Sequence, residues 1–95
     1  MARREMLTVV CYDVARGAAR RRVAAVLEDA MVRVQKSVFE ARLTAAEADR
    51  IARAAAAHLE PGDSLRLYAV AADGLPRSRA YGPLPLAEDA DFWLL

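Results

Sequence analysis

The stretch TVVCYDVARGAARRR, from Thr8 to Arg22, decides the fold of this 95-residue chain. Its first half belongs to a strand, MLTVVCYD (residues 6–13), in which β-forming residues alternate between two largely apolar faces. A strand that is apolar on both faces is expected in the centre of a sheet. Gly17 then breaks the alternation, and from Ala18 onward apolar residues recur every three or four positions, as in an amphipathic helix. A central strand therefore ends on a carboxylate, Asp13, directly before a helix rich in arginine.

Further elements follow in the rest of the chain. VRVQKSVFEARL (residues 32–43) predicts a second strand whose polar centre indicates a bulge or bend, and a short strand or turn is expected around residues 39–43. Thr44 and Glu47 have the spacing of a capping box at the start of an alanine-rich helix. DSLRLYAVA (residues 63–71) alternates from face to face and predicts another strand.

This order predicts an α+β, ferredoxin-like βαββαβ domain with an antiparallel sheet and two helices on one face. By size, residues 1–95 form one domain, with residues 1–5 as an N-terminal extension, 71–89 as a loop and 90–95 as an extra C-terminal strand. The second sheet face is left uncovered, and we expect a homodimer to pack through it. The side chains expected at this dimer or partner interface are aromatic or apolar: Tyr12, Phe39, Tyr68, Phe92, Trp93 and Leu94. For Tyr12, Phe39 and Tyr68 the core is the alternative place.

Composition indicates a globular protein, with 56% hydrophobic and 28% charged residues and a net charge of only +1. No apolar run approaches the roughly 18 residues that a membrane helix needs, so we expect no membrane partner. The lone cysteine, Cys11, can form no internal disulfide, which fits a reducing, cytoplasmic location. Basic residues concentrate between Arg16 and Lys36, and acidic residues concentrate after Leu84. This asymmetry suggests a nucleic acid at one end and a protein partner at the other, although an ordinary solvated surface would carry the same charges.

Four segments carry a family resemblance: VVCYDV in the first strand, RRRVAAVL in the helix, RVQKSVFEARLT after it, and DSLRLYAV. Together they resemble CRISPR-associated protein 2, the small subunit that works beside the CRISPR integrase in spacer acquisition. The resemblance covers Met6 to Val70. It implies a ferredoxin-like homodimer that bridges two integrase dimers and binds the duplex being integrated. Members of the family have also been described as magnesium-dependent nucleases on RNA or DNA, with the strand-end aspartate as metal ligand.

Asp13 is the residue on which the family's metal ligand falls, so it is the candidate Mg²⁺ ligand and the candidate catalytic residue. Mg²⁺ is usually held by one or two carboxylates, with water and substrate phosphate completing its octahedron. One aspartate per chain is a poor site, and the metal interpretation therefore requires two copies of Asp13 at the dimer axis. The alternative is structural, since an aspartate between a strand and a helix commonly caps the turn.

A second group of candidates consists of basic side chains that could bind nucleic acid: Arg16, Arg20, Arg21, Arg33 and Lys36. The family's basic residues behind the first strand fall on Arg16 and Arg20. Arginine presents a fork of donors that matches a phosphate, and phosphate contacts give affinity without sequence information. The alternative is a solvated helix face whose arginines are balanced by acids such as Glu28.

Three classes of function fit these residues. The first is an adaptor that binds duplex DNA, or RNA, and bridges integrase dimers in spacer acquisition. The second is a Mg²⁺-dependent endonuclease of the same family that hydrolyses phosphodiester bonds at Asp13. The third is a ferredoxin-like regulatory module that binds a small molecule between subunits, and such a module would need no arginine cluster beside Asp13.

Overall fold

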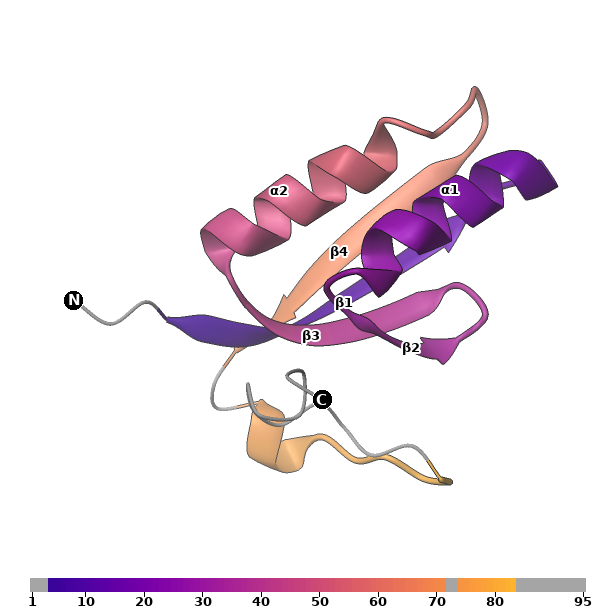
Figure 1. The fold of residues 1–95 in the computed structure, drawn as a ribbon. Helices are drawn as coiled ribbons and strands as arrows, with labels where there is room; N and C mark the ends of the chain where they lie inside the picture. Colours follow the sequence, from indigo (N-terminus) through magenta and orange to yellow (C-terminus); the bar gives the residue numbers. More distant parts are fainter. Residues whose placement is uncertain (1–3, 72–73, 84–95) are drawn as a thin grey trace.

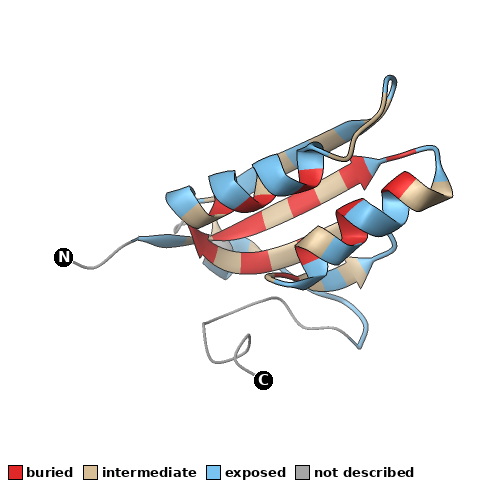
Figure 2. Ribbon diagram, turned by 45° about the horizontal axis from the view of Figure 1, so that its top comes forward, coloured by how far each residue is buried: buried red, intermediate tan, exposed pale blue. Residues whose placement is uncertain are grey.

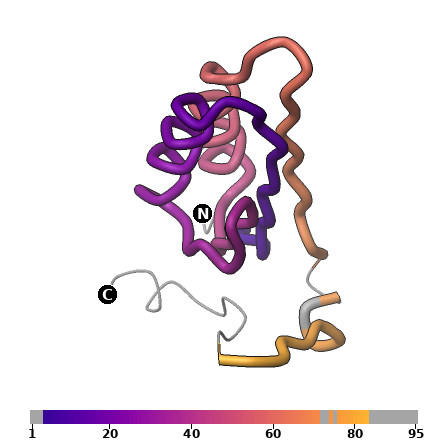
Figure 3. The backbone as a smooth tube through the Cα atoms, turned by 90° about the vertical axis from the view of Figure 1, so that its right-hand side faces the viewer, coloured from indigo at the N-terminus to yellow at the C-terminus, as the bar shows by residue number. Residues whose placement is uncertain are grey.

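The computed structural model describes residues 4–71 and 74–83. Its elements follow one another as β1 (Glu5–Asp13), α1 (Gly17–Glu28), β2 (Val32–Gln35), β3 (Val38–Thr44), α2 (Ala45–Ala56), β4 (Ser64–Val70) and a 3₁₀ helix, η1 (Leu75–Arg77). The predicted βαββαβ order is confirmed, and both helices lie on one side of the sheet (Figure 1). Seen from the side in Figure 3, the helices form one layer and the strands another. Within the described ranges, no helix is long and apolar enough to span a bilayer.

The four strands form one antiparallel sheet in the order β2-β3-β1-β4. β1 is central, because it pairs with β3 on one side and with β4 on the other. Val10 accordingly lies opposite Phe39 on β3 and opposite Leu67 on β4. The prediction of a central first strand is confirmed, and the end of this strand, at Asp13, lies among loops from several parts of the chain.

The second predicted strand is instead a hairpin. β2 and β3 run antiparallel and are joined at Lys36 and Ser37, whose polar side chains favour a turn over the interior of a strand. The register shifts between Arg33 and Gln35, which places an irregularity just before the turn. The turn lies beside the end of β1, because the Ser37 carbonyl accepts a 3.1 Å hydrogen bond from the backbone N–H of Tyr12.

The core lies between the sheet and the helices, where Figure 2 shows the buried residues gathered. Tyr12 and Phe39 belong to it, with exposed fractions of 7% and 0%. The expectation that both rings lie on the uncovered face of the sheet is therefore wrong. Alternation divides a strand into two faces without saying which face the helices will cover. Tyr68 does lie on the uncovered face, since its neighbour Leu67 packs against the core while Tyr68 is 52% exposed.

The remaining predictions concern the two ends of the chain and the loop after β4. Phe92, Trp93 and Leu94, and with them the terminal strand predicted over residues 90–95, lie outside the described residues. The described part of the predicted loop, residues 71–89, contains η1. β1 begins at Glu5, so the last residue of the predicted N-terminal extension is already in the sheet.

α2 begins where its capping box predicts. The Thr44 hydroxyl accepts a 3.2 Å hydrogen bond from the backbone N–H of Glu47, and the Glu47 carboxylate accepts one of 2.8 Å from the backbone N–H of Thr44. Ala48, Ile51 and Ala55 are the buried stripe of this helix. The predicted N-terminus of α2 is confirmed.

Candidate nucleic-acid-binding groove

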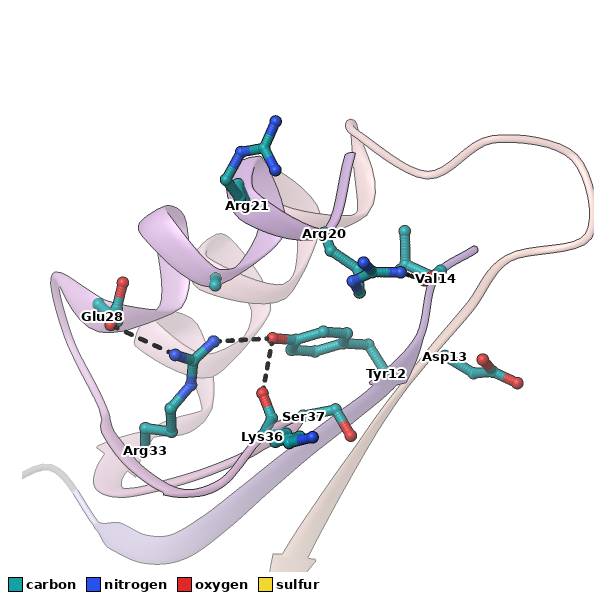
Figure 4. Close-up of a pocket in the computed structure, with 10 residues that line it drawn as sticks. Tyr12, Asp13, Val14, Arg20, Arg21, Glu28, Arg33, Lys36 and Ser37 are labelled. Atoms are coloured by element: carbon teal, nitrogen blue, oxygen red, sulfur yellow. Dashed lines mark hydrogen bonds and ion pairs between the residues drawn. The ribbon is translucent and has the colours of Figure 1, made fainter. Parts of the chain in front are cut away.

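An open groove of about 720 Å³ lies between the end of β1, α1 and the β2–β3 hairpin (Figure 4). Ten residues from these elements and their loops line it: Tyr12, Asp13, Val14, Arg20, Arg21, Ala24, Glu28, Arg33, Lys36 and Ser37. We call it the basic groove, because four of these side chains are basic and two are acidic. The fold thus brings five of the six candidate metal and nucleic-acid residues together, and Arg16 is the one that does not line the groove.

Asp13 is the last residue of β1, opposite Ser64 of β4, and its side chain is exposed. It does not cap α1, whose N-cap residue is Arg16 and whose N-terminus has no side-chain cap. In the part of the chain that the structure describes, no three acidic, histidine or cysteine side chains gather into a metal site. The described part of one chain therefore holds no preformed cluster of three ligands at Asp13, and the metal interpretation still requires two copies of Asp13 at a dimer axis.

The turn after Asp13, for which a cap by Asp13 was the structural alternative, is held by Asp63. The Asp63 carboxylate accepts hydrogen bonds from the backbone N–H groups of Ala15, at 3.1 Å, and of Glu60, at 2.9 Å. It thereby joins the β1–α1 loop to the α2–β4 turn. Sequence reasoning missed this residue, and the available signal was the turn sequence EPGD, in which an aspartate follows Pro61 and Gly62.

Arg20 lines the groove, and its side chain is hydrogen-bonded to the loop between β1 and α1. Its Nη1 donates hydrogen bonds to the backbone carbonyls of Val14, at 3.2 Å, and Ala15, at 2.8 Å. Arg21, the next residue of α1, is exposed and makes no hydrogen bond or ion pair with any described residue. The two neighbouring arginines therefore differ, because one stabilises the loop after Asp13 while the other is free to meet a ligand.

Arg16 lies outside the groove and is paired with an acid. Its Nη1 is 2.8 Å from the Glu60 carboxylate, and the two side chains are 69% and 35% exposed. The pair joins the start of α1 to the turn after α2. Arg16 thus retains solvent access, but part of its charge is balanced within the chain.

Arg33 lies over the core ring of Phe39, with its guanidinium carbon 5.2 Å from the ring centroid. Its Nη1 is 3.9 Å from the Glu28 carboxylate, and its Nη2 donates a 3.3 Å hydrogen bond to the hydroxyl of Tyr12. The rings of Tyr12 and Phe39 are stacked, with centroids 6.3 Å apart. Arg33 is therefore fixed in place by an acid, a hydroxyl and an aromatic face.

Lys36 is at the tip of the hairpin, and its side chain is exposed at the edge of the groove (Figure 4). Its ammonium group has no ion-pair partner among the residues that the structure describes. Its backbone carbonyl accepts a 3.1 Å hydrogen bond from the Tyr12 hydroxyl. Lys36 and Arg21 are thus the two cations of the groove without a protein partner in the described ranges.

Known proteins resemble the chain in sequence. The family model described as CRISPR associated protein Cas2 matches residues 6–75. A protein of Chloroflexus aurantiacus, named CRISPR-associated endoribonuclease Cas2 3, is 38% identical over 79 residues. The matched region covers 82% of this chain and 85% of the relative, so the similarity extends over most of both.

Solved structures resemble the chain in fold. A hypothetical protein from Thermus thermophilus has a TM-score of 0.69 at 34% identity, covering 85% of this chain and 98% of that one. Cas2 of Streptococcus pyogenes has a TM-score of 0.66 at 31% identity, covering 81% and 100%. A chain of a partial Cas6–RT–Cas1–Cas2 complex, at 24% identity and a TM-score of 0.64, covers 90% and 94% and shows the fold alone. From the family match and the extent of the sequence identity, the chain belongs to the CRISPR associated protein Cas2 family.

Proposed function

We propose that the protein is the nucleic-acid-binding adaptor subunit of a CRISPR spacer acquisition complex, in which it holds duplex DNA and bridges dimers of the integrase. The observation that carries this proposal is the basic groove, which gathers four basic side chains from α1 and from the β2–β3 hairpin. Membership of the Cas2 family supports the assignment to CRISPR systems.

The chemistry of the groove suits a phosphate backbone. Arg21 and Lys36 lie on different elements and have no partner among the described residues, so each can neutralise a phosphate without breaking a bond within the chain. Phosphate contacts position a duplex but carry no sequence information. An adaptor for spacers of any sequence needs this kind of binding.

The second part of the proposal is a homodimer that packs through the uncovered sheet face. The central strand presents Val9 and Cys11 there, both half-buried, and β4 presents Tyr68 opposite Val9. The Tyr68 hydroxyl accepts a 3.2 Å hydrogen bond from Arg66, and this bond raises the pKa of Arg66. A second copy would remove this apolar surface from water and would give one particle two basic grooves.

Binding measurements on charge variants test the groove. We expect the protein to bind a labelled duplex of mixed sequence with an affinity that falls steeply with salt, because each neutralised phosphate releases counterions. Arg21→Ala combined with Lys36→Ala should lower the affinity at least about tenfold and reduce the slope of log K against log salt by about two contacts.

The matched control is Arg50→Ala combined with Arg53→Ala, which removes the same charge from the exposed side of α2. This variant should bind DNA nearly as the unmodified protein does. Equal losses in the two double variants would mean that DNA does not use the basic groove. No binding of duplex by the unmodified protein would remove the proposal altogether.

A second candidate function is Mg²⁺-dependent cleavage of RNA or DNA. One relative is named an endoribonuclease, and Asp13 stands exposed at the wall of the groove in which a phosphate would bind. The ion would need Asp13 from both copies of a dimer, with water and phosphate oxygens as further ligands. Bound there, Mg²⁺ would polarise the phosphodiester and activate water.

A further inference from the structure

We propose that Tyr12 is a positioning residue of the basic groove, whose hydroxyl fixes Lys36 and Arg33 in the arrangement that meets phosphates. This inference rests on the proposed binding of nucleic acid in the groove. The group that acts is the neutral hydroxyl of Tyr12, whereas the other residues proposed to bind nucleic acid in this groove are charged.

Tyr12 holds the hairpin turn at two successive residues. Its backbone N–H donates to the carbonyl of Ser37 at 3.1 Å, and its hydroxyl donates to the carbonyl of Lys36 at 3.1 Å. Any residue except proline could make the first hydrogen bond at this position, whereas the second needs the phenol. The hydroxyl therefore determines how the turn residue Lys36 is presented at the edge of the groove.

The same hydroxyl also connects the turn to Arg33. It accepts a 3.3 Å hydrogen bond from Nη2 of Arg33, whose guanidinium lies over the ring of Phe39. A hydroxyl has one donor and two acceptor positions, so it can serve the Lys36 carbonyl and Arg33 at once. Tyr12 thus connects the guanidinium of Arg33 to the backbone of Lys36, the two residues whose cations the hairpin contributes to the groove (Figure 4).

The packing of the core does not explain the hydroxyl. The ring of Tyr12 is stacked with that of Phe39, and the residue is 7% exposed, so a phenylalanine would fill nearly the same space. Phenylalanine would leave the Lys36 carbonyl and the Arg33 guanidinium without this partner. The ring therefore serves the core, and the hydroxyl serves the groove.

The test is Tyr12→Phe, measured by anisotropy of a labelled duplex over a series of salt concentrations. We expect the affinity to fall about threefold to tenfold, because the two hydrogen bonds that hold the Lys36 backbone and Arg33 are lost. We also expect the slope of log K against log salt to decrease by about one contact, although no charge has been removed. A change that only loosened the core would not alter the number of counterions released.

Two further variants complete the experiment. Tyr81→Phe removes the same atom from a tyrosine that is 91% exposed, and it should change neither affinity nor slope. In a double-mutant cycle, Tyr12→Phe should cost less in a Lys36→Ala background than alone, because the cation that it positions is absent. Full additivity, or a lower affinity with an unchanged slope, would show that the hydroxyl does not position Lys36.

A measurement on the unmodified protein covers the case in which Tyr12→Phe does not fold. The hydroxyl proton of Tyr12 should be observable by NMR, and its chemical shift should change when duplex is added, since the hydroxyl donates its hydrogen bond to the backbone carbonyl of Lys36. An unchanged chemical shift of this proton while DNA binds would contradict the inference. If the unmodified protein binds no duplex, the proposed function fails first, and this outcome is distinguishable from a Tyr12→Phe variant that binds normally.

Discussion

Arg16 and Glu60 form an ion pair of 2.8 Å that joins the first residue before α1 to the turn after α2. Both side chains are accessible to solvent, at 69% and 35% exposure, so the pair contributes less than about 1 kcal/mol to stability. Its larger effect should be on binding, because Glu60 balances a positive charge that lies near the basic groove.

Glu60→Gln should therefore raise the affinity for duplex DNA by about twofold to threefold, since Arg16 loses its competing carboxylate. Anisotropy titrations at low salt would measure this gain. The same substitution in an Arg16→Ala background is the control, and there the gain should be smaller. An equal gain in both backgrounds would mean that Glu60 acts on DNA directly and not through Arg16.

Asp63→Ala should lower the free energy of unfolding by about 1–3 kcal/mol, because two backbone N–H groups lose a charged acceptor. Urea denaturation followed by circular dichroism would measure the change. Asp49→Ala on the exposed side of α2 is a matched control that should cost less, since its pair with Arg53 is on the surface. A similar loss in both variants would contradict the role of Asp63 in joining the two loops.

Asp13→Asn should leave the fold and the affinity for DNA nearly intact, with binding strengthened slightly by the loss of one negative charge from the groove. The side chain has no hydrogen-bond partner in the described ranges, so little stability depends on it. Any Mg²⁺-dependent cleavage by the purified protein should disappear, because neutral amides cannot replace carboxylates as hard ligands. Spacer acquisition should persist if the protein acts as an adaptor, and its loss in a folded, DNA-binding variant would favour catalysis at Asp13.

Tyr68→Glu should weaken the proposed homodimer, because it places a charge on the uncovered sheet face, on the edge strand β4. Sedimentation at micromolar concentration would show a shift toward monomer. Tyr81→Glu makes the same chemical change at a residue that is 91% exposed in the loop after β4 and serves as control. A monomeric unmodified protein would remove the dimer from the proposal, while its DNA binding could still be measured.

The elements predicted well are those whose signals are local. The capping box from Thr44 to Glu47 sets the start of α2 through hydrogen bonds within one turn, and the apolar alternation of β1 reflects its place in the sheet. The hairpin of β2 and β3 was harder to predict from sequence, because the polar residues Lys36 and Ser37 in an apolar pattern fit either a bulge or a turn. Pairing between β2 and β3 decides the matter, and that pairing is not a local property of the sequence.

The sequence predicted most of the charged residues of the site but not the contacts that hold them and the neighbouring loops. The candidate cations Arg20, Arg21, Arg33 and Lys36 do line one groove, but the contacts that hold the neighbouring loops join distant parts of the chain. Glu60 is 44 positions from Arg16, and Asp63 is 48 positions from Ala15, so neither contact has a signal in sequence spacing. The face of Tyr12 was misassigned for a related reason, since the side of the sheet that the helices cover is set by tertiary packing.

The stacking of Tyr12 on Phe39 also has a thermodynamic consequence for ligand binding. Tyr12 belongs both to the core and to the wall of the groove. The shape of this wall is therefore set when the chain folds, and a ligand does not have to order it. Association with a polyanion should therefore be accompanied by a small heat-capacity change, because little apolar surface becomes buried. The enthalpy of binding should therefore change little with temperature. Calorimetry would distinguish this preformed groove from a segment that folds around its ligand.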